Sequence, residues 1–236
     1  MPDTNSLEKM LHHLMEMDDD TWGLYAFTRE ILKNRIQPDQ KLDMIIKANA
    51  CGKEYAHKII KETGCRDIKT IAEQLKLKVE FHDTSMIGKR VLFAQFTPPN
   101  QIEIMKEPIH RAVSKITEDA SILVDLFQQN DIIDIILGHE IYHFVEEEYS
   151  QMIYTRTEKI LLWKFFGFKN YSVIRTLGEI GAMAFTKELM GLKFSPFILD
   201  VLLYYCYDPA SAEKIYRDVL ANQVRKVQKS IEDCKQ

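Results

Sequence analysis

Residues 137–144 read LGHEIYHF and contain the pattern His-Glu-x-x-His. On a helix, His139 and His143 lie one turn apart on the same face, as two ligands of one metal ion require. Glu140 follows the first histidine and can reach a metal-bound water without binding the metal. In a chain of this composition the pattern arises by chance in roughly one or two cases per hundred. The prediction therefore also requires a helix around the motif and a third ligand elsewhere.

The residues around the motif predict a buried helix. Apolar residues precede it almost without interruption: Ile132, Ile133, Ile135, Ile136 and Leu137. A helix that is apolar nearly all round belongs in a core. Histidine and glutamate are costly to bury there without partners, and a metal ion would compensate that cost. We expect the charge run 146–148 to be a solvated surface where the helix leaves the core.

A candidate third ligand follows in the next strong helix, predicted from Tyr171 to Met190 after a short helix from Lys159 to Phe166. Each of its two glycines, Gly178 and Gly181, costs about 1 kcal/mol relative to alanine inside a helix. Together with two neighbouring alanines they indicate a close backbone approach. Glu179 lies among them, either as a metal ligand or only as an interface or surface carboxylate, and the composition leaves both readings open.

Before the motif, the apolar period changes from 3.6 to 2. Leu77–Phe81 alternates as a half-buried strand, Arg90–Phe96 reads as a second strand and Gln101–Met105 as a third. Thr97–Asn100 is a turn, so the last two strands form a predicted hairpin. Three strands give a small antiparallel or mixed sheet that needs helices on one face. An exposed edge of the hairpin could bind an extended peptide by strand addition.

The remaining segments predict helices. These are Pro38–Glu62 with its stop at Gly64, Ile68–Leu75 capped by Asp67, Pro108–Gln128 with a fresh cap at Asn130–Asp131, Pro196–Tyr205 and Pro209–Ile231. The fold class is therefore α+β and mostly helical. We divide the chain into an N-terminal helical extension (1–37), a core (38–192) and C-terminal helices packed on that core (193–236).

Composition excludes several classes of protein. The net charge of −4 and the pI near 6 give no reason to expect nucleic acid or a membrane as the main partner. No secretory signal and no run of about 18 apolar residues is present. Four scattered cysteines, Cys51, Cys65, Cys206 and Cys234, are expected to be reduced thiols in a cytoplasmic protein.

The chemistry that these residues support is zinc-dependent hydrolysis. Catalytic zinc favours three protein ligands and an open position, and His139, His143 and Glu179 supply one known set. Glu140 would take a proton from the activated water and deliver it to the leaving amine. An oxyanion donor is also needed. The candidates are Tyr149, Tyr154 and Tyr171, whereas Tyr142 ranks low because it points away from the two histidines.

Three segments resemble the ImmA/IrrE-like metallopeptidases, small cytoplasmic relatives of the gluzincins. They are KEYAHKIIKETGCRDIKTIAEQLKLKVEF (53–81), GHEIYHFVEE (138–147) and EIGAMAFTKELM (179–190), and the likeness covers roughly residues 45–192. In the third segment Glu179, Ala182, Phe185 and Leu189 match the family pattern. Gly181 replaces its second acidic residue and Met183 its usual asparagine.

The resemblance implies a minimal gluzincin-like core, in which the small sheet packs on the motif helix and on a second ligand-bearing helix. It implies Zn²⁺ as cofactor, Glu179 as the third ligand, and endopeptidase activity on a protein or peptide, such as a separate transcriptional repressor. Residues 1–37 are too short and insufficiently basic for a DNA-binding domain. Two alternatives remain: a catalytically silent zinc-binding regulatory or interaction module, and a helical interaction protein with a coincidental motif.

Overall fold

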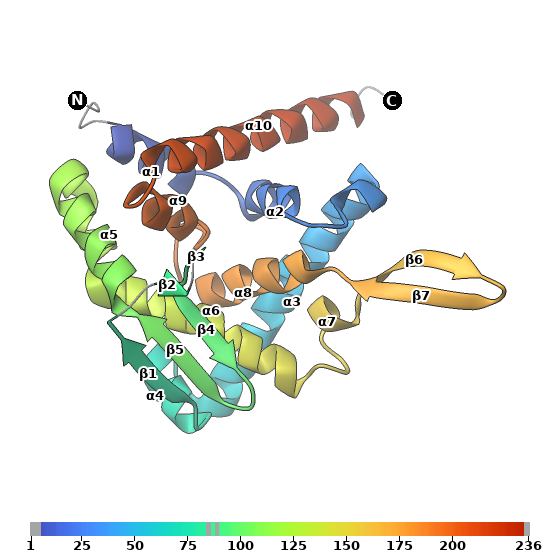
Figure 1. Ribbon diagram of the computed structural model, residues 1–236, viewed down its shortest axis with the longest axis horizontal. Helices are drawn as coiled ribbons and strands as arrows, with labels where there is room; N and C mark the ends of the chain where they lie inside the picture. Colours follow the sequence, from blue (N-terminus) through green and yellow to red (C-terminus); the bar gives the residue numbers. More distant parts are fainter. Residues whose placement is uncertain (1–5, 84–85, 88–89, 234–236) are drawn as a thin grey trace.

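The chain folds into a mostly helical α+β structure, as the sequence predicts. The computed structural model describes residues 6–83, 86–87 and 90–233 (Figure 1). Its α-helices are α1 (Ser6–Met15), α2 (Asp19–Thr28), α3 (Pro38–Thr63), α4 (Ile68–Gln74), α5 (Lys106–Asp119), α6 (Gln129–Glu148), α7 (Tyr154–Thr157), α8 (Arg175–Met190), α9 (Ile198–Tyr205) and α10 (Pro209–Asp233). Two 3₁₀ turns join them, η1 (Lys33–Arg35) and η2 (Ser121–Leu126).

The main sheet is small and mixed. Its order is β1 (Lys78–His82), β5 (Gln101–Met105), β4 (Ala94–Thr97), with β1 parallel and β4 antiparallel to the central strand. The predicted hairpin of the last two strands is confirmed. The second predicted strand is divided, because β3 (Arg90–Val91) pairs with β2 (Met86–Ile87) in a separate ribbon. The mostly apolar sequence of residues 90–96 contains no glycine or proline that would indicate where the chain changes its pairing partner.

The motif helix α6 lies at the centre of the molecule, between the sheet and α8 (Figure 1). Ile102 and Ile104 of β5 are fully buried, as are Ile132 and Ile141 of α6. One continuous apolar cluster runs from Leu7 near the beginning of the chain to Val219 in α10. The helices at the two ends of the chain lie side by side, since α10 packs on α2 and on α1. The prediction that α6 is buried is confirmed.

The small residues of α8 allow it to pack closely against two helices at once. A Cβ atom on Gly52 of α3 would lie 2.2 Å from the carbonyl oxygen of Gly181, and a Cβ atom on Gly181 would lie 2.4 Å from the hydroxyl of Tyr142 in α6. The predicted close backbone approach is therefore confirmed with α3, whereas on the α6 side Gly181 makes room for the side chain of Tyr142. This packing sets the position of α8 relative to the motif.

Gly52→Ala tests that packing. Alanine in a helix is normally more stable than glycine by about 1 kcal/mol, but here the added methyl group meets backbone atoms that cannot rotate away. We expect the free energy of unfolding to fall by about 1–3 kcal/mol, measured by chemical denaturation. Ala50→Gly, at an exposed position of the same helix, reports the effect of propensity alone. A rise in stability for Gly52→Ala would contradict the close approach.

Three other predictions about local structure are wrong. Residues 159–166 form no helix: β6 (Lys159–Phe165) and β7 (Phe168–Val173) make an antiparallel hairpin, so α8 begins at Arg175. The run is rich in branched and aromatic residues, which favour strands. The helix predicted to reach Gln128 ends at Asp119, before η2. The cap predicted at Asn130–Asp131 is absent because α6 already begins at Gln129.

Other local predictions are confirmed. Gly64 ends α3 with φ of 71°, and the side chain of Asp67 accepts a hydrogen bond from the amide of Thr70 at the start of α4. Cys51, Cys65 and Cys206 are free, whereas Cys234 lies outside the described residues. Among the helices that the structure describes, none is both long enough and apolar enough to cross a bilayer.

Candidate metal centre

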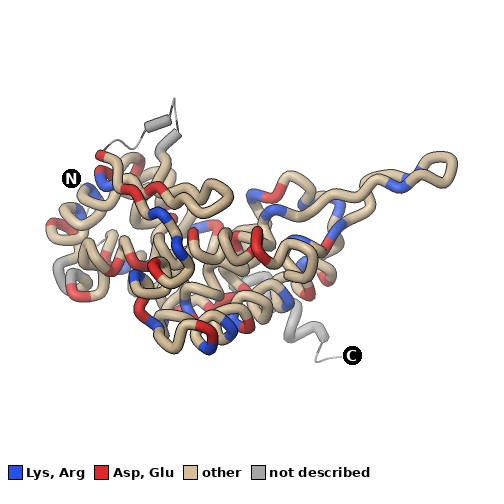
Figure 2. Tube along the Cα trace, turned by 90° about the horizontal axis from the view of Figure 1, so that it is seen from below, with Lys and Arg blue, Asp and Glu red and all other residues tan. Residues whose placement is uncertain are grey.

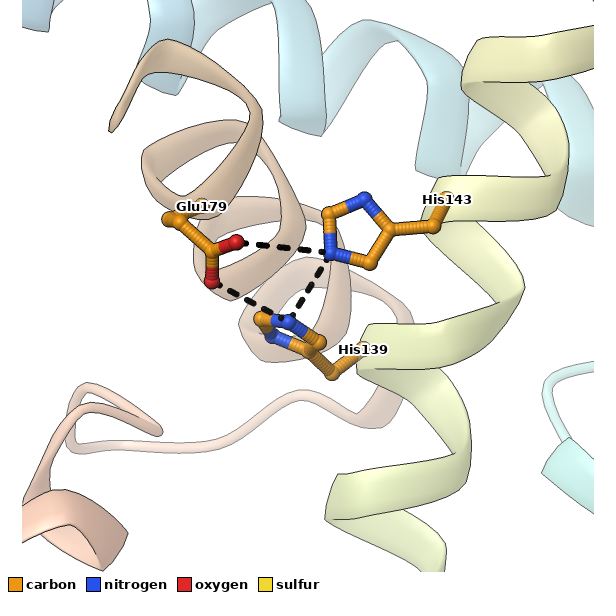
Figure 3. Close-up of side chains that lie close together, drawn as sticks. All are labelled: His139, His143 and Glu179. Carbon is orange, nitrogen blue, oxygen red and sulfur yellow. Dashed lines mark hydrogen bonds and ion pairs between the residues drawn. The ribbon is translucent and has the colours of Figure 1, made fainter. Parts of the chain in front are cut away.

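Three side chains from two helices converge on one point (Figure 3). The Nε2 atoms of His139 and His143 in α6 are 3.1 Å apart. Glu179 of α8 places one carboxylate oxygen 3.4 Å from Nε2 of His139 and the other 3.8 Å from Nε2 of His143. Ligand atoms about 2.0–2.1 Å from a tetrahedral zinc ion lie about 3.3 Å from one another. The spacing of the three groups therefore fits a single ion.

Glu146 orients His143 for this role. Its Oε2 atom lies 2.9 Å from Nδ1 of His143. An ionised carboxylate only accepts hydrogen bonds, so Nδ1 carries the proton and Nε2 keeps its lone pair toward the cluster. The hydroxyl of Thr155 donates to the other oxygen of Glu146. Carboxylates commonly hold metal-binding histidines in this way.

The burial of Glu146 differs from the solvated position that its sequence predicts. Glu147 and Glu148 are exposed, as expected for a solvated run, but Glu146 is 3% exposed. A signal for this was present: position 146 follows His143 by three residues, so the two side chains share one helix face. Glu146 therefore belongs to the site, although the next two glutamates of the same run are exposed.

The electrostatics of the cluster favour an ionised Glu179. Burial disfavours the charged form of His139, but the hydrogen bond and the charge of Glu179 outweigh it and raise the pKa of His139 to about 9. Burial likewise opposes ionisation of Glu179, yet the hydrogen bond from His139 and the charges of both histidines lower its pKa to about 2. The negative charge of Glu179 thus stabilises a positive charge beside it. A bound cation would supply that positive charge.

Nδ1 of His139 is buried and has no hydrogen-bond partner among the described residues. Its Nε2 atom therefore carries all the polar contacts of this ring within the described part of the chain, and those contacts are to the other two members of the cluster. A metal ion at Nε2 would compensate for burying a histidine in this helix. The donor set and its surroundings fit the ion that the sequence predicts.

The cluster lies in a pocket of about 530 Å³. Glu140 lines the pocket beside the two histidines, and β4 lines another side with Ala94, Gln95 and Phe96. Because β4 is the last strand of the sheet order, it is an edge strand. Most of the remaining lining is apolar, while Arg156 and Asp200 contribute charge. The pocket therefore combines the predicted cluster, the predicted base and a strand edge.

None of the four tyrosines considered as oxyanion donors is among the described residues that line this pocket. The hydroxyl of Tyr142 lies 3.1 Å from Oγ1 of Thr155 and turns away from the cluster, as expected. Tyr149 packs on Tyr55, and Tyr171 is exposed in the β6–β7 hairpin. Arg156 also lines the pocket. The sequence did not predict this, because no spacing rule links residue 156 to the motif.

A second group that could hold a metal lies on the outer face of the sheet, away from the pocket. Glu80 and Glu103 pair across β1 and β5, and Nε2 of His82 lies 3.2 Å from Glu103 and 3.9 Å from Glu80. A protonated His82 would offset two like charges placed opposite each other. Nε2 of His82 lies within ion-pair distance of both carboxylates and makes no hydrogen bond among the described residues.

Glu146→Gln tests the support of His143. The amide oxygen of glutamine can still accept a hydrogen bond from Nδ1–H. The amide cannot supply the negative charge that strengthens the histidine as a ligand. We expect the affinity for zinc to fall about 10–100-fold, measured by competition with a chelator of known affinity. Glu147→Gln changes the exposed neighbour by the same atoms and should leave the affinity unchanged. Equal affinities for the two variants would contradict the assignment.

No family model matches the chain, and neither a curated protein nor a solved structure matches it significantly. A function for this chain is therefore inferred from the geometry and the chemistry of its own residues.

Proposed function

We propose that this protein is a zinc-dependent endopeptidase of the ImmA/IrrE-like, gluzincin-related kind. The observation that carries the proposal is the convergence of His139, His143 and Glu179, with contacts of 3.1–3.8 Å, in the pocket that Glu140 also lines. Zinc held by these three side chains would supply a Lewis acid and lower the pKa of water to near neutrality. Hydrolysis of a peptide bond is the reaction that this set of groups suits best.

Glu140 is the general base in this proposal, because the other pocket carboxylates are engaged. Asp200 lies 2.8 Å from the guanidinium of Arg29, and Glu179 belongs to the histidine cluster. Among the described residues, Glu140 has no hydrogen-bond or salt-bridge partner of its own, and it lines the pocket. It can accept a proton from the attacking water and return it to the leaving amine.

The edge strand β4 is the proposed site for the substrate backbone. An extended peptide can add to such an edge through main-chain hydrogen bonds, with alternate side chains directed into the pocket. Phe93, Met183 and Leu203 line that pocket, so apolar substrate side chains are favoured next to the cleaved bond. The guanidinium of Arg156 can stabilise negative charge that develops on a carbonyl oxygen. A separate transcriptional repressor is the substrate class that the resemblance implies.

The second candidate is a zinc-binding regulatory module without turnover. Two observations favour it: no tyrosine is among the described residues that line the pocket, and Arg156 is held by Glu146 and Glu147 at 3.7 and 3.3 Å. An arginine that stays in those ion pairs would not reach the oxygen of a reacting carbonyl. The two candidates share the metal and differ in catalysis.

Metal analysis combined with a peptide library separates them. The endopeptidase predicts about one zinc per chain, cleavage of unstructured peptides detected by mass spectrometry, loss of cleavage with a chelator, and recovery when zinc is restored. Bound zinc without any cleavage would favour the silent module. A purified chain that binds no zinc would exclude both and leave the motif as a coincidence.

A further inference from the structure

The β6–β7 hairpin projects from the body of the molecule as a narrow two-stranded ribbon (Figures 1 and 2). In the middle of β6 the guanidinium of Arg35 donates a hydrogen bond of 2.8 Å to the carbonyl oxygen of Leu162. A two-stranded hairpin has little core of its own and is marginal in water when isolated. Large apolar side chains on such a ribbon are therefore unexpected unless something outside the fold covers them.

The pairing of the strands gives the ribbon two different faces. Trp163 shares a face with the paired residues Phe165 and Phe168, because alternate side chains of a strand point to the same side. An irregularity of the register lies between Leu161 and Trp163. Lys164 and Lys169 are paired on the opposite face. Trp163, Phe165 and Phe168 are 51%, 66% and 74% exposed. Near the apex one face is therefore aromatic and the other carries the two lysines, while the pair of Leu161 and Tyr171 lies farther from the apex on the lysine face.

The turn at the apex points to the same conclusion. Phe166 and Gly167 have φ angles of 45° and 84°, the left-handed conformation that a two-residue hairpin turn requires and that asparagine and glycine favour. A bulky aromatic residue is unfavourable there. Phe166 is also 87% exposed and so contributes little to the core. An aromatic residue that neither the turn nor the core favours indicates a contact outside the chain.

Charge identifies the chemistry of the partner. Residues 159–173 contain three lysines and no acidic residue, although the whole chain carries a net charge of −4. Figure 2 shows blue positions and no red ones along the projecting part of the ribbon. Lys164 and Lys169 lie directly opposite each other, one residue behind the pair of Phe165 and Phe168. Like charges in this position repel each other, and an anionic partner would remove that repulsion.

We propose that the β6–β7 hairpin binds the surface of an anionic lipid bilayer, with its aromatic apex inserted at the level of the headgroups. Aromatic side chains favour that interface, and lysines just behind them can extend to the lipid phosphates. A bilayer accepts a convex apex without a complementary pocket. Lysines and a register irregularity along its strands also oppose the addition of a partner strand. The charge of the whole chain, which led us to expect no membrane partner, averages over this local excess of lysine.

Vesicle flotation with the full chain tests the proposal. Wild-type protein should float with vesicles of phosphatidylcholine and phosphatidylserine, and at least about tenfold less with phosphatidylcholine alone. The apex variant Phe166→Asn with Phe168→Ser should lose at least about tenfold in affinity. It should not melt earlier, because asparagine suits the turn. The charge variant Lys164→Glu with Lys169→Glu should lose a similar factor on anionic vesicles.

Matched controls separate the hairpin from general surface effects. Lys61→Glu with Lys78→Glu makes the same change of charge at exposed positions on α3 and β1, and Ile31→Ser removes an apolar side chain that is 87% exposed elsewhere. Both controls should float like wild type. The chain has two tryptophans, and Trp22 is fully buried. A blue shift of fluorescence on adding anionic vesicles should therefore vanish in Trp163→Phe.

Several results would overturn the proposal. These are absence of flotation with anionic vesicles, equal flotation of the apex variant, and equal flotation of the charge variant. Sedimentation velocity adds a further one: a wild-type dimer that becomes a monomer in the apex variant would assign the apolar face to a second copy of the chain. Each measurement is independent of zinc and of peptide hydrolysis, so its outcome does not depend on the proposed enzyme activity.

Discussion

Glu140→Gln is expected to abolish peptide hydrolysis while the chain keeps its zinc. Glutamine preserves the size of the side chain and removes the anionic oxygen that accepts the proton from water. Loss of a general base lowers kcat/KM by about 10²–10⁴-fold. The metal content should stay the same, because Glu140 lies outside the cluster of His139, His143 and Glu179. Steady-state cleavage of a peptide found in the library screen and metal analysis of the same sample measure both quantities.

Glu147→Gln is the control for this substitution, since Glu147 lies on the same helix and is exposed. It should retain wild-type turnover. A Glu140→Gln variant that loses zinc would make Glu140 a ligand, and one that keeps full activity would exclude it as the base. If wild type itself has no activity while zinc is bound, the silent module is the better description of the protein.

Glu179→Ala is expected to remove tight zinc binding and the stability that zinc supplies. Two histidines from one helix would remain, without the carboxylate from α8. A ligand present at 1,000 times its dissociation constant stabilises the folded state by about 4 kcal/mol. The wild-type melting temperature should therefore rise on addition of zinc, and that of Glu179→Ala should rise far less. Metal stoichiometry and thermal unfolding with and without zinc measure the difference.

Glu188→Ala provides a matched control on the same helix. Glu188 pairs with the exposed His57 at 2.8 Å and lies outside the pocket lining. Its loss should leave both zinc binding and the zinc-dependent rise in melting temperature unchanged. Similar zinc affinity in Glu179→Ala and wild type would show that the third ligand is another group, and would contradict the proposed centre.

The sequence predicts best the long helices, whose apolar and small residues recur over several turns. The helix around His139 was identifiable because its apolar residues surround it, and the glycines near Glu179 correctly indicated a close approach of helices. The convergence of Glu179 with the two histidines matches the ligand reading of that residue, which composition left open and the family resemblance favoured. Local periodicity cannot establish such a contact, because it joins separate helices.

The failures have different physical causes. Residues 159–165 are apolar and aromatic without a clear period, so the run fits a short helix as well as a strand, and pairing with β7 decides the outcome. Glu146 looked like one member of a charge run, although its place on the helix set it toward His143. Arg156 lies in α7, after the motif helix, and lines the pocket without any spacing in the sequence that links it to the motif. Strand pairing and the position of Arg156 depend on contacts outside one helix, whereas Glu146 reaches His143 within α6 and its spacing of three residues could have indicated that contact.

The glycine contact between α3 and α8 also has a consequence for the order in which the centre assembles. His139 and His143 come into register as soon as α6 forms, whereas Glu179 is in place only after residues 52 and 181 have met. Contacts between positions so distant in sequence form late and slowly. In the proposed zinc enzyme, a chain in which α3 and α8 have not yet packed would therefore offer zinc only the two histidines of α6. Complete metal binding would then follow the packing of α3 against α8.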